Sequence, residues 1–137
     1  METNHISKGR RLTSYIMSGL VILFMLMDST FKFVISPESV DANMKLGYSD
    51  HHLVTMGILG LIPTLLYLIP RTSILGVVLL TGYFGGAVAT HFRVDNPLFS
   101  HTLFPVYLAV LAWGGLWLRN SQLRSLIPLK TGRPAGS

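Results

Sequence analysis

Four apolar runs, separated by short polar segments, make up most of this sequence. A helix that crosses a bilayer needs about 20 consecutive apolar residues. The third run carries no formal charge from Thr72 to Thr90, and the other three are of similar length. The pattern predicts an all-α membrane protein, a bundle of four transmembrane helices. The expected spans cover approximately residues 13–34, 52–69, 73–91 and 102–118.

The polar ends of the chain complete the expected domain organisation. Residues 1–12 are short, polar and basic. The apolar run that follows them is too long for a signal peptide, so we interpret them as a cytosolic leader. Residues 13–128 form the expected transmembrane domain. The last residues, 129–137, have the composition of a flexible tail.

Residues 35–50 form the longest polar connection between apolar runs. Pro37 follows Ser36, which is typical of a helix start, and Gly47 is a plausible stop. We expect a short helix at the membrane interface, serving either as a lid or as a plain connector.

Two local patterns concern the third span. Thr72 or Ser73 is expected to cap its first turn. Small residues then recur within about 100° of arc on a helical wheel. Such a face lets a second helix approach closely, so the pattern predicts a central helix packed through its glycines. The small residues are Gly82, Gly85, Gly86 and Ala89.

Composition and charge support the membrane assignment. Only 12% of the residues are charged, against about a quarter in soluble domains, and mean hydropathy is +0.50. The net charge of +5 does not indicate nucleic acid, because the basic residues lie at the ends of apolar runs. Eight of the eleven Lys and Arg residues fall on the side of the two termini. The positive-inside rule therefore predicts that both termini are cytoplasmic.

That orientation gathers the ionisable groups at the outer end of the bundle. Four of five histidines and five of six acids fall there. Asp28 and Lys32 are four residues apart in a helix, so they share a face and can pair. The alternative is that Lys32 extends to the headgroups and the pair only marks the membrane edge.

Buried ionisable groups are costly in membranes, which makes this cluster a candidate site. Asp28 or His91 is a candidate acid or base, Lys32 or Arg93 can stabilise an anion, and Tyr83 lies deeper. Further candidate ligand-binding residues are Arg93, Asp95, His51, His52 and His101. No metal site is predicted, because there is no HExxH motif and adjacent histidines on a helix point about 100° apart.

Several motifs resemble the DoxX-like family of small bacterial membrane proteins. They are Leu-Gly-Tyr at 46–48, Leu-Ile-Pro-Arg-Thr at 68–72 and Gly-Tyr-Phe-Gly-Gly-Ala-Val-Ala-Thr-His-Phe-Arg at 82–93, with Leu-Arg-Asn and Leu-Ile-Pro near the end. The resemblance implies four transmembrane helices in the bacterial inner membrane. It also implies a link to quinone-dependent oxidation, such as thiosulfate oxidation, in part of the family. Asp28 departs from the pattern, in which a small residue is expected, and this favours a specialised role.

Three functions remain open at this point. The first is a membrane-embedded site that binds a small lipophilic molecule and acts on it by acid–base chemistry, such as isomerisation or epoxide opening. The second is an accessory or quinone-binding subunit of a membrane oxidoreductase. The third is a non-catalytic assembly partner. The expected partners are the lipid bilayer, a lipophilic ligand, and either a second copy of the chain or a membrane redox partner, but not nucleic acid. No cofactor motif is evident, and quinone and haem stay open. Whether the protein is an enzyme is undecided.

Overall fold

A computed structural model describes residues 7–34 and 36–128, and this part of the chain consists of helices, turns and short connections without strands. The longest helices are α1 (Lys8–Phe33), α3 (Leu53–Leu68), α4 (Ser73–Arg93) and α5 (Phe104–Arg119). The shorter helices are α2 (Pro37–Lys45) and α6 (Ser121–Leu126), and single helical turns occur at η1 (Asp50–His52), η2 (Pro70–Thr72) and η3 (Leu98–Thr102).

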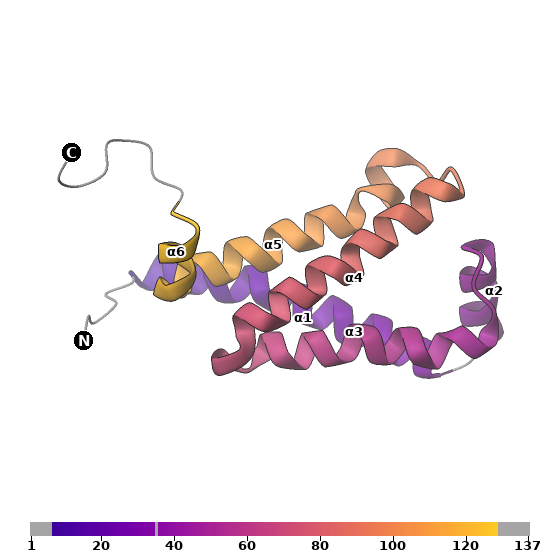
Figure 1. Cartoon of the computed structure of the whole chain (residues 1–137), viewed down its shortest axis with the longest axis horizontal. Helices are drawn as coiled ribbons and strands as arrows, with labels where there is room; N and C mark the ends of the chain where they lie inside the picture. The colour runs from indigo at the N-terminus through magenta and orange to yellow at the C-terminus, as the bar shows by residue number, and fades with distance from the viewer. Residues whose placement is uncertain (1–6, 35, 129–137) are drawn as a thin grey trace.

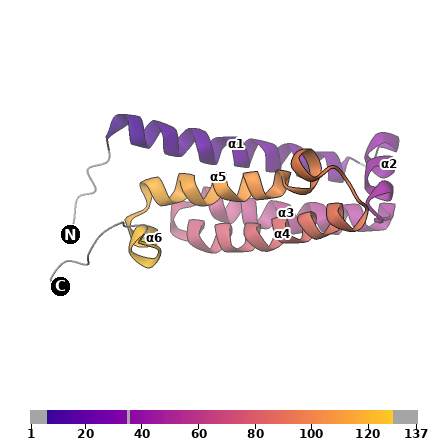
Figure 2. The same cartoon turned by 90° about the horizontal axis from the view of Figure 1, so that it is seen from above.

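The four longest helices run side by side. α1 packs against α3 and α5, and α4 packs against the same two helices (Figures 1 and 2). α2 lies across one end of this group, and α6 lies at the other end (Figure 1). The start of α1 meets the end of α5, where the Arg10 guanidinium Nε donates a hydrogen bond to the Leu118 carbonyl over 2.9 Å.

Helical spacing explains which faces are buried. The buried residues of α1 recur every three or four positions, which places them on one stripe facing α3 and α5. They are Ser14, Ser18, Val21, Met25, Ser29 and Lys32. On α4 the corresponding stripe includes Val77, Leu80 and Phe84.

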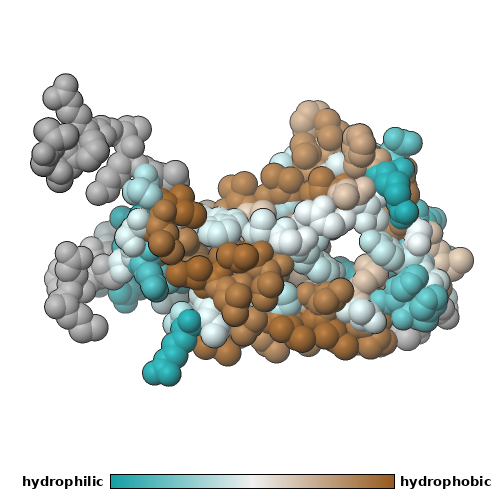
Figure 3. Space-filling view, in the orientation of Figure 1, coloured by the Kyte–Doolittle hydropathy of each residue, from teal (hydrophilic) through white to brown (hydrophobic). Residues whose placement is uncertain are grey.

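The outward faces are apolar as well. Large side chains such as Leu23, Leu59 and Val110 are more than half exposed, and brown apolar surface covers much of the long helices in Figure 3. Helices that are apolar outside as well as inside are typical of membrane proteins. Three segments are long and apolar enough to cross a bilayer, namely Lys8–Phe33, Pro70–Arg93 and Leu98–Arg119, whereas α3 is a shorter apolar helix of 16 residues. The prediction of a helical, multi-pass membrane protein is thereby confirmed.

α3 and α4 form a close hairpin. A Cβ added at Gly76 would lie 2.2 Å from the backbone nitrogen of Tyr67, so only glycine fits there. Tyr67 is fully buried, and its hydroxyl donates to the Ala112 carbonyl over 2.6 Å and is 2.7 Å from the Ser18 hydroxyl. This one side chain therefore links α3 to α1 and α5.

The predicted glycine contact on α4 is wrong within this chain. A Cβ added at Gly82, Gly85 or Gly86 would meet no atom within 4 Å. The neighbouring helices pack instead on the stripe that includes Val77 and Leu80, which buries larger side chains. Hydrophobic stabilisation scales with buried area, and this favours the larger stripe.

The predicted cap of α4 is also wrong in its chemistry. Thr72 occupies the N-cap position, but its hydroxyl makes no cap hydrogen bond. It donates instead to the Leu66 carbonyl over 2.7 Å, and the Ser73 hydroxyl donates to the Tyr67 carbonyl over 2.8 Å. These hydroxyls therefore satisfy the last carbonyls of α3 rather than the first amides of α4.

The connection at 35–50 contains the expected short helix. Ser36 caps α2 by accepting from the Ser39 amide over 3.2 Å, Pro37 opens the helix, and Gly47 has a φ of +90° just after its end. α1 begins at Lys8, earlier than the predicted residue 13, because Ser7 caps it. Residues 1–6 of the predicted leader and the predicted tail at 129–137 lie outside the described residues.

Candidate functional site

An ion pair occupies the last turns of α1. Lys32 Nζ donates a hydrogen bond to Asp28 Oδ2, as the spacing of four residues predicts. Lys32 is 7% exposed, and 26% of the Asp28 side chain is exposed. Lys32 continues the buried stripe of α1 into the protein, so the alternative in which it extends to the headgroups is wrong.

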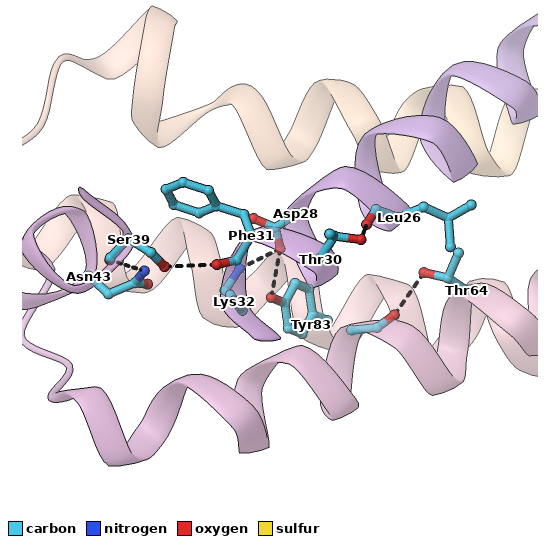
Figure 4. A network of polar contacts seen from close by, with 10 residues as sticks. Leu26, Asp28, Thr30, Phe31, Lys32, Ser39, Asn43, Thr64 and Tyr83 are labelled. Atoms are coloured by element: carbon cyan, nitrogen blue, oxygen red, sulfur yellow. Dashed lines mark hydrogen bonds and ion pairs between the residues drawn. The ribbon is translucent and has the colours of Figure 1, made fainter. Parts of the chain in front are cut away.

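Tyr83 of α4 completes this cluster. Its hydroxyl donates to the same Asp28 Oδ2 over 3.3 Å, and its ring centroid lies 5.9 Å from Lys32 Nζ (Figure 4). Asp28 therefore accepts two hydrogen bonds, one from an ammonium group and one from a phenol. Because both donors bind Oδ2, the other carboxylate oxygen of Asp28, Oδ1, can accept a hydrogen bond from a further partner.

The cluster lies in the wall of a cavity of about 510 Å³. Binding sites for small molecules commonly measure roughly 300–1,000 Å³ and are mostly apolar. Phe24, Leu59, Phe84 and Leu108 are among its apolar lining residues. Figure 3 shows the molecule hollowed between α4 and α3 on the side nearer α2. The polar side chains of the lining are Asp28, Lys32, Asn43, Tyr48, Tyr83, Thr90 and His91.

His91 reaches the same cavity from the last turn of α4. Tyr83, Ala87 and His91 all line it, as their spacing of four residues predicts. Asn96 Nδ2 is 2.7 Å from His91 Nδ1, so Nδ1 accepts from the amide and Nε2 is left for other contacts. Within the described residues, no hydrogen bond joins His91 to Asp28. A ligand or water shared by these two residues stays a prediction.

The other candidate residues do not converge on Asp28. His52 and Arg93 line a neighbouring cavity of about 420 Å³, and Arg93 Nη2 donates to the Leu46 carbonyl over 2.9 Å. His51 and His101 are exposed and contact Ser49 and Ser100.

Asp95 is exposed just after α4, with a φ of 56°. Among residues 7–34 and 36–128, no three His, Asp or Glu side chains gather in a way that could hold a metal ion.

Sequence reasoning missed two polar residues of the cavity wall. The Tyr48 hydroxyl is 2.8 Å from the Thr90 hydroxyl and borders both cavities. Buried Asn43 donates from Nδ2 to the Ser39 carbonyl over 2.9 Å. Ser39 in turn donates to the Phe31 carbonyl over 2.9 Å, which ties α2 to the end of α1 (Figure 4). The available signal was the spacing of Ser39 and Asn43, which places two small polar residues on one face of α2.

The sequence was compared with protein families, curated proteins and solved structures. No curated protein and no solved structure matched the chain. The model of the DoxX-like family matches residues 16–115. This range includes α3 and α4 completely, α1 without its first turns, and α5 without its last turn. The matched region covers more than half of the sequence and contains Asp28, Lys32, Tyr83 and His91. The chain therefore belongs to the DoxX-like family.

Proposed function

We propose that the cavity between α1 and α4 binds a small, mostly apolar molecule with one oxygen function, and that Asp28 moves a proton on it. The observation that carries this proposal is the Asp28–Lys32 pair, joined by the Tyr83 hydroxyl, in the wall of a mainly apolar cavity. Such a wall offers a lipophile an apolar enclosure with a few polar groups that can anchor it.

Stability alone gives little reason to keep this pair. The cost of desolvating two charges often exceeds their attraction, and apolar replacements are often neutral or stabilising. Ionisable residues inside membrane proteins are for that reason candidates for function. Lys32 at 7% exposure is the most deeply buried charged side chain among the described residues, and it faces a cavity rather than a sealed core.

The geometry suits proton transfer next to a carbonyl group. Asp28 would accept a proton from a carbon beside the carbonyl, while Lys32 and Tyr83 donate hydrogen bonds to the oxygen that gains negative charge. Returning a proton from Asp28 to a different carbon completes an isomerisation, with no net gain or loss of atoms. Exchange of the abstracted proton with water before this return places solvent hydrogen in the product. With an epoxide, Lys32 or Tyr83 would stabilise the oxygen released as the ring opens. Asp28 would accept a proton from the attacking water and pass it to that oxygen, which gives a diol and restores the carboxylate.

The ligand can enter from the bilayer. Four apolar lining residues are 37% to 57% exposed. They are Phe24, Phe31, Leu59 and Phe104. An apolar rim of this kind lets a lipophile pass from the hydrocarbon into the cavity without crossing water.

Mass spectrometry of the molecules that purify with the protein tests this function. Wild-type protein should retain a lipophilic compound, and Gly86→Leu should lose it, because Gly86 lines the cavity and an added Cβ meets open space. The recovered compound is then incubated with protein in D₂O, where proton abstraction exchanges hydrogen for deuterium. Lys45→Ala should retain both properties, since Lys45 does not line the cavity.

The variants separate binding from chemistry. Asp28→Asn combined with Lys32→Met should abolish deuterium incorporation, because no carboxylate is left to accept the proton. Equal recovery of the compound from wild type and Gly86→Leu would place it outside the cavity. Binding without deuterium incorporation in the wild type would contradict the proton transfer.

A second function uses the same cavity. An ammonium group and a phenol that face a space accessible from lipid also suit the carbonyl oxygens of a quinone. A quinone-binding or accessory subunit would then release a quinone on extraction, recognisable by its redox-dependent ultraviolet spectrum. A quinone that exchanges no deuterium would favour this second function over the first.

We further propose that α1, α3, α4 and α5 all cross the bacterial inner membrane, with both termini in the cytoplasm. The side-by-side packing of the four long helices supports four crossings. The hydrogen bond from Arg10 to Leu118 supports a common side for the start of α1 and the end of α5. Arg71 and the other described cations of that end support a cytoplasmic side for it. These other cations are Lys8, Arg10, Arg11, Arg119 and Arg124.

A further inference from the structure

A third cavity lies at the opposite end of the molecule from Asp28. Its volume is about 360 Å³, and its lining comes from α1, from the end of α3 and the turn after it, from the first residue of α4, and from the end of α5. Arg11 and Arg119 line it together with the polar residues Tyr15, Ser18 and Asn120. The proposed function assigns no role to this cavity.

Arg119 is held in a fixed orientation. Its Nη1 donates to the Ser18 hydroxyl over 2.6 Å and to the Ser14 hydroxyl over 3.1 Å. Its guanidinium carbon lies 5.4 Å from the Tyr15 ring centroid and 5.9 Å from that of Tyr67. Within the described residues Nε and Nη2 have no hydrogen-bond partner. A planar group fixed on one edge and open on the other can bind two oxygens of one anion.

The described part of the chain supplies no anion at this end. Every described acidic residue belongs to the last turns of α1, to α2 or to the connections at the α2 end. Further cations add to the charge: Arg10 Nε and Arg124 Nη1 both donate to the Leu118 carbonyl over 2.9 Å. Burial and the Arg10 charge lower the pKa of Arg124. An excess of positive charge without a counter-ion favours binding of an external anion.

The cavity also has an apolar side. Gly19, Ile22 and Leu68 line it, and a Cβ added at Gly19 would meet no atom within 4 Å. Leu68 is 54% exposed. The cavity therefore combines two arginines with an apolar groove along Gly19, Ile22 and Leu68, which fits an amphiphile with an anionic head.

We propose that this cavity binds an anionic phospholipid, with its phosphate between Arg11 and Arg119 and an acyl chain along Gly19. Basic pockets between transmembrane helices are known sites for phosphate-bearing lipid heads. The planar guanidinium group matches phosphate oxygens. The groove beside Gly19 leaves room for an acyl chain, which a lipid has and free phosphate lacks.

Titration of phosphatidylglycerol into the purified protein in uncharged detergent tests the site. Thermal unfolding and native mass spectrometry give the affinity and the number of bound lipids. Wild type should bind phosphatidylglycerol and gain thermal stability, whereas phosphatidylcholine should give little of either. Arg11→Gln should weaken binding about tenfold or more, the usual effect of losing one charge-assisted hydrogen bond. Gly19→Leu should weaken it comparably by filling the groove.

Matched controls make the same types of substitution at residues that do not line the cavity. Arg71→Gln removes a charge at the same end, and Gly85→Leu adds the same side chain at another open position; neither residue lines the cavity. Both should bind within twofold of wild type. Equal losses in Arg11→Gln and Arg71→Gln would show diffuse attraction to a basic surface and overturn the proposal. Equal stabilisation by inorganic phosphate or glycerol phosphate alone would assign the site to free phosphate and overturn it as well.

Discussion

Asp28 and Lys32 depend on each other, so removing one charge differs from removing both. Asp28→Asn leaves a buried ammonium without its counter-ion. We expect a loss of roughly 2–3 kcal/mol in the free energy of unfolding, below the ~3–5 kcal/mol typical of fully buried pairs because part of Asp28 is exposed. Adding Lys32→Met should restore most of that loss. Unfolding in detergent measures both variants, and a double variant no more stable than the single one would contradict the coupling.

Helical periodicity decided which site residues could be predicted from the sequence. Asp28 and Lys32 on α1, and Tyr83 and His91 on α4, are separated by four or eight residues, and such spacings fix a common face before any tertiary packing is known. Arg93 lies at the end of α4, where its side chain turned toward the Leu46 carbonyl. Tyr48 follows Gly47, whose φ is positive. The direction of its side chain depends on the conformation of this turn, which helical periodicity does not predict.

Among elements, the α3–α4 hairpin has the tightest backbone approach. Gly76→Ala should destabilise the protein by about 3 kcal/mol or more, because the methyl group would overlap the Tyr67 backbone and overpacking alone costs roughly 1–3 kcal/mol. Gly85→Ala is the matched control on the same helix. It meets open space and should be neutral or slightly stabilising, since alanine favours helix. Equal melting temperatures for the two variants would contradict the close approach.

α2 differs from the long helices in what it buries. Its buried side chains are Ser39 and Asn43, both polar, whereas each long helix buries large apolar groups. Little hydrophobic free energy therefore opposes its local opening. Backbone amides of residues 40–45 should exchange with deuterium faster than those of α3 and α4 when followed by mass spectrometry. Exchange of α2 as slow as that of α4 would refute this ranking.

The elements themselves followed from hydropathy, but their mutual packing did not. The apolar runs located α1, α3, α4 and α5 to within a few residues of most of their ends. The glycines of α4 led to a wrong contact because small residues permit close approach without requiring a partner. Where two faces of one helix compete, the face with Val77, Leu80 and Phe84 packs inward because it buries more area.

For the whole molecule, the proposed four-crossing topology predicts the side of the membrane on which each connection lies. A cytoplasmic reporter fused after Ser137 should be active, and a periplasmic reporter fused after Ala42, within α2, should be active. A periplasmic reporter fused after Ser137 and a cytoplasmic reporter fused after Ala42 should both be inactive. Activity of the periplasmic reporter at Ser137 would contradict the proposed orientation.

The two ends of the molecule differ in charge, and an electric field across the membrane acts on that difference. Six described cations and no described acid lie at the Arg10–Arg119 end, whereas acids outnumber cations at the α2 end. Each charge moved through a potential of 100 mV changes the energy by about 2.3 kcal/mol. In the proposed orientation, a potential that is negative in the cytoplasm stabilises the cationic end on the cytoplasmic side and opposes inversion. Collapsing this potential with an uncoupler during synthesis should raise the fraction of chains inserted upside down.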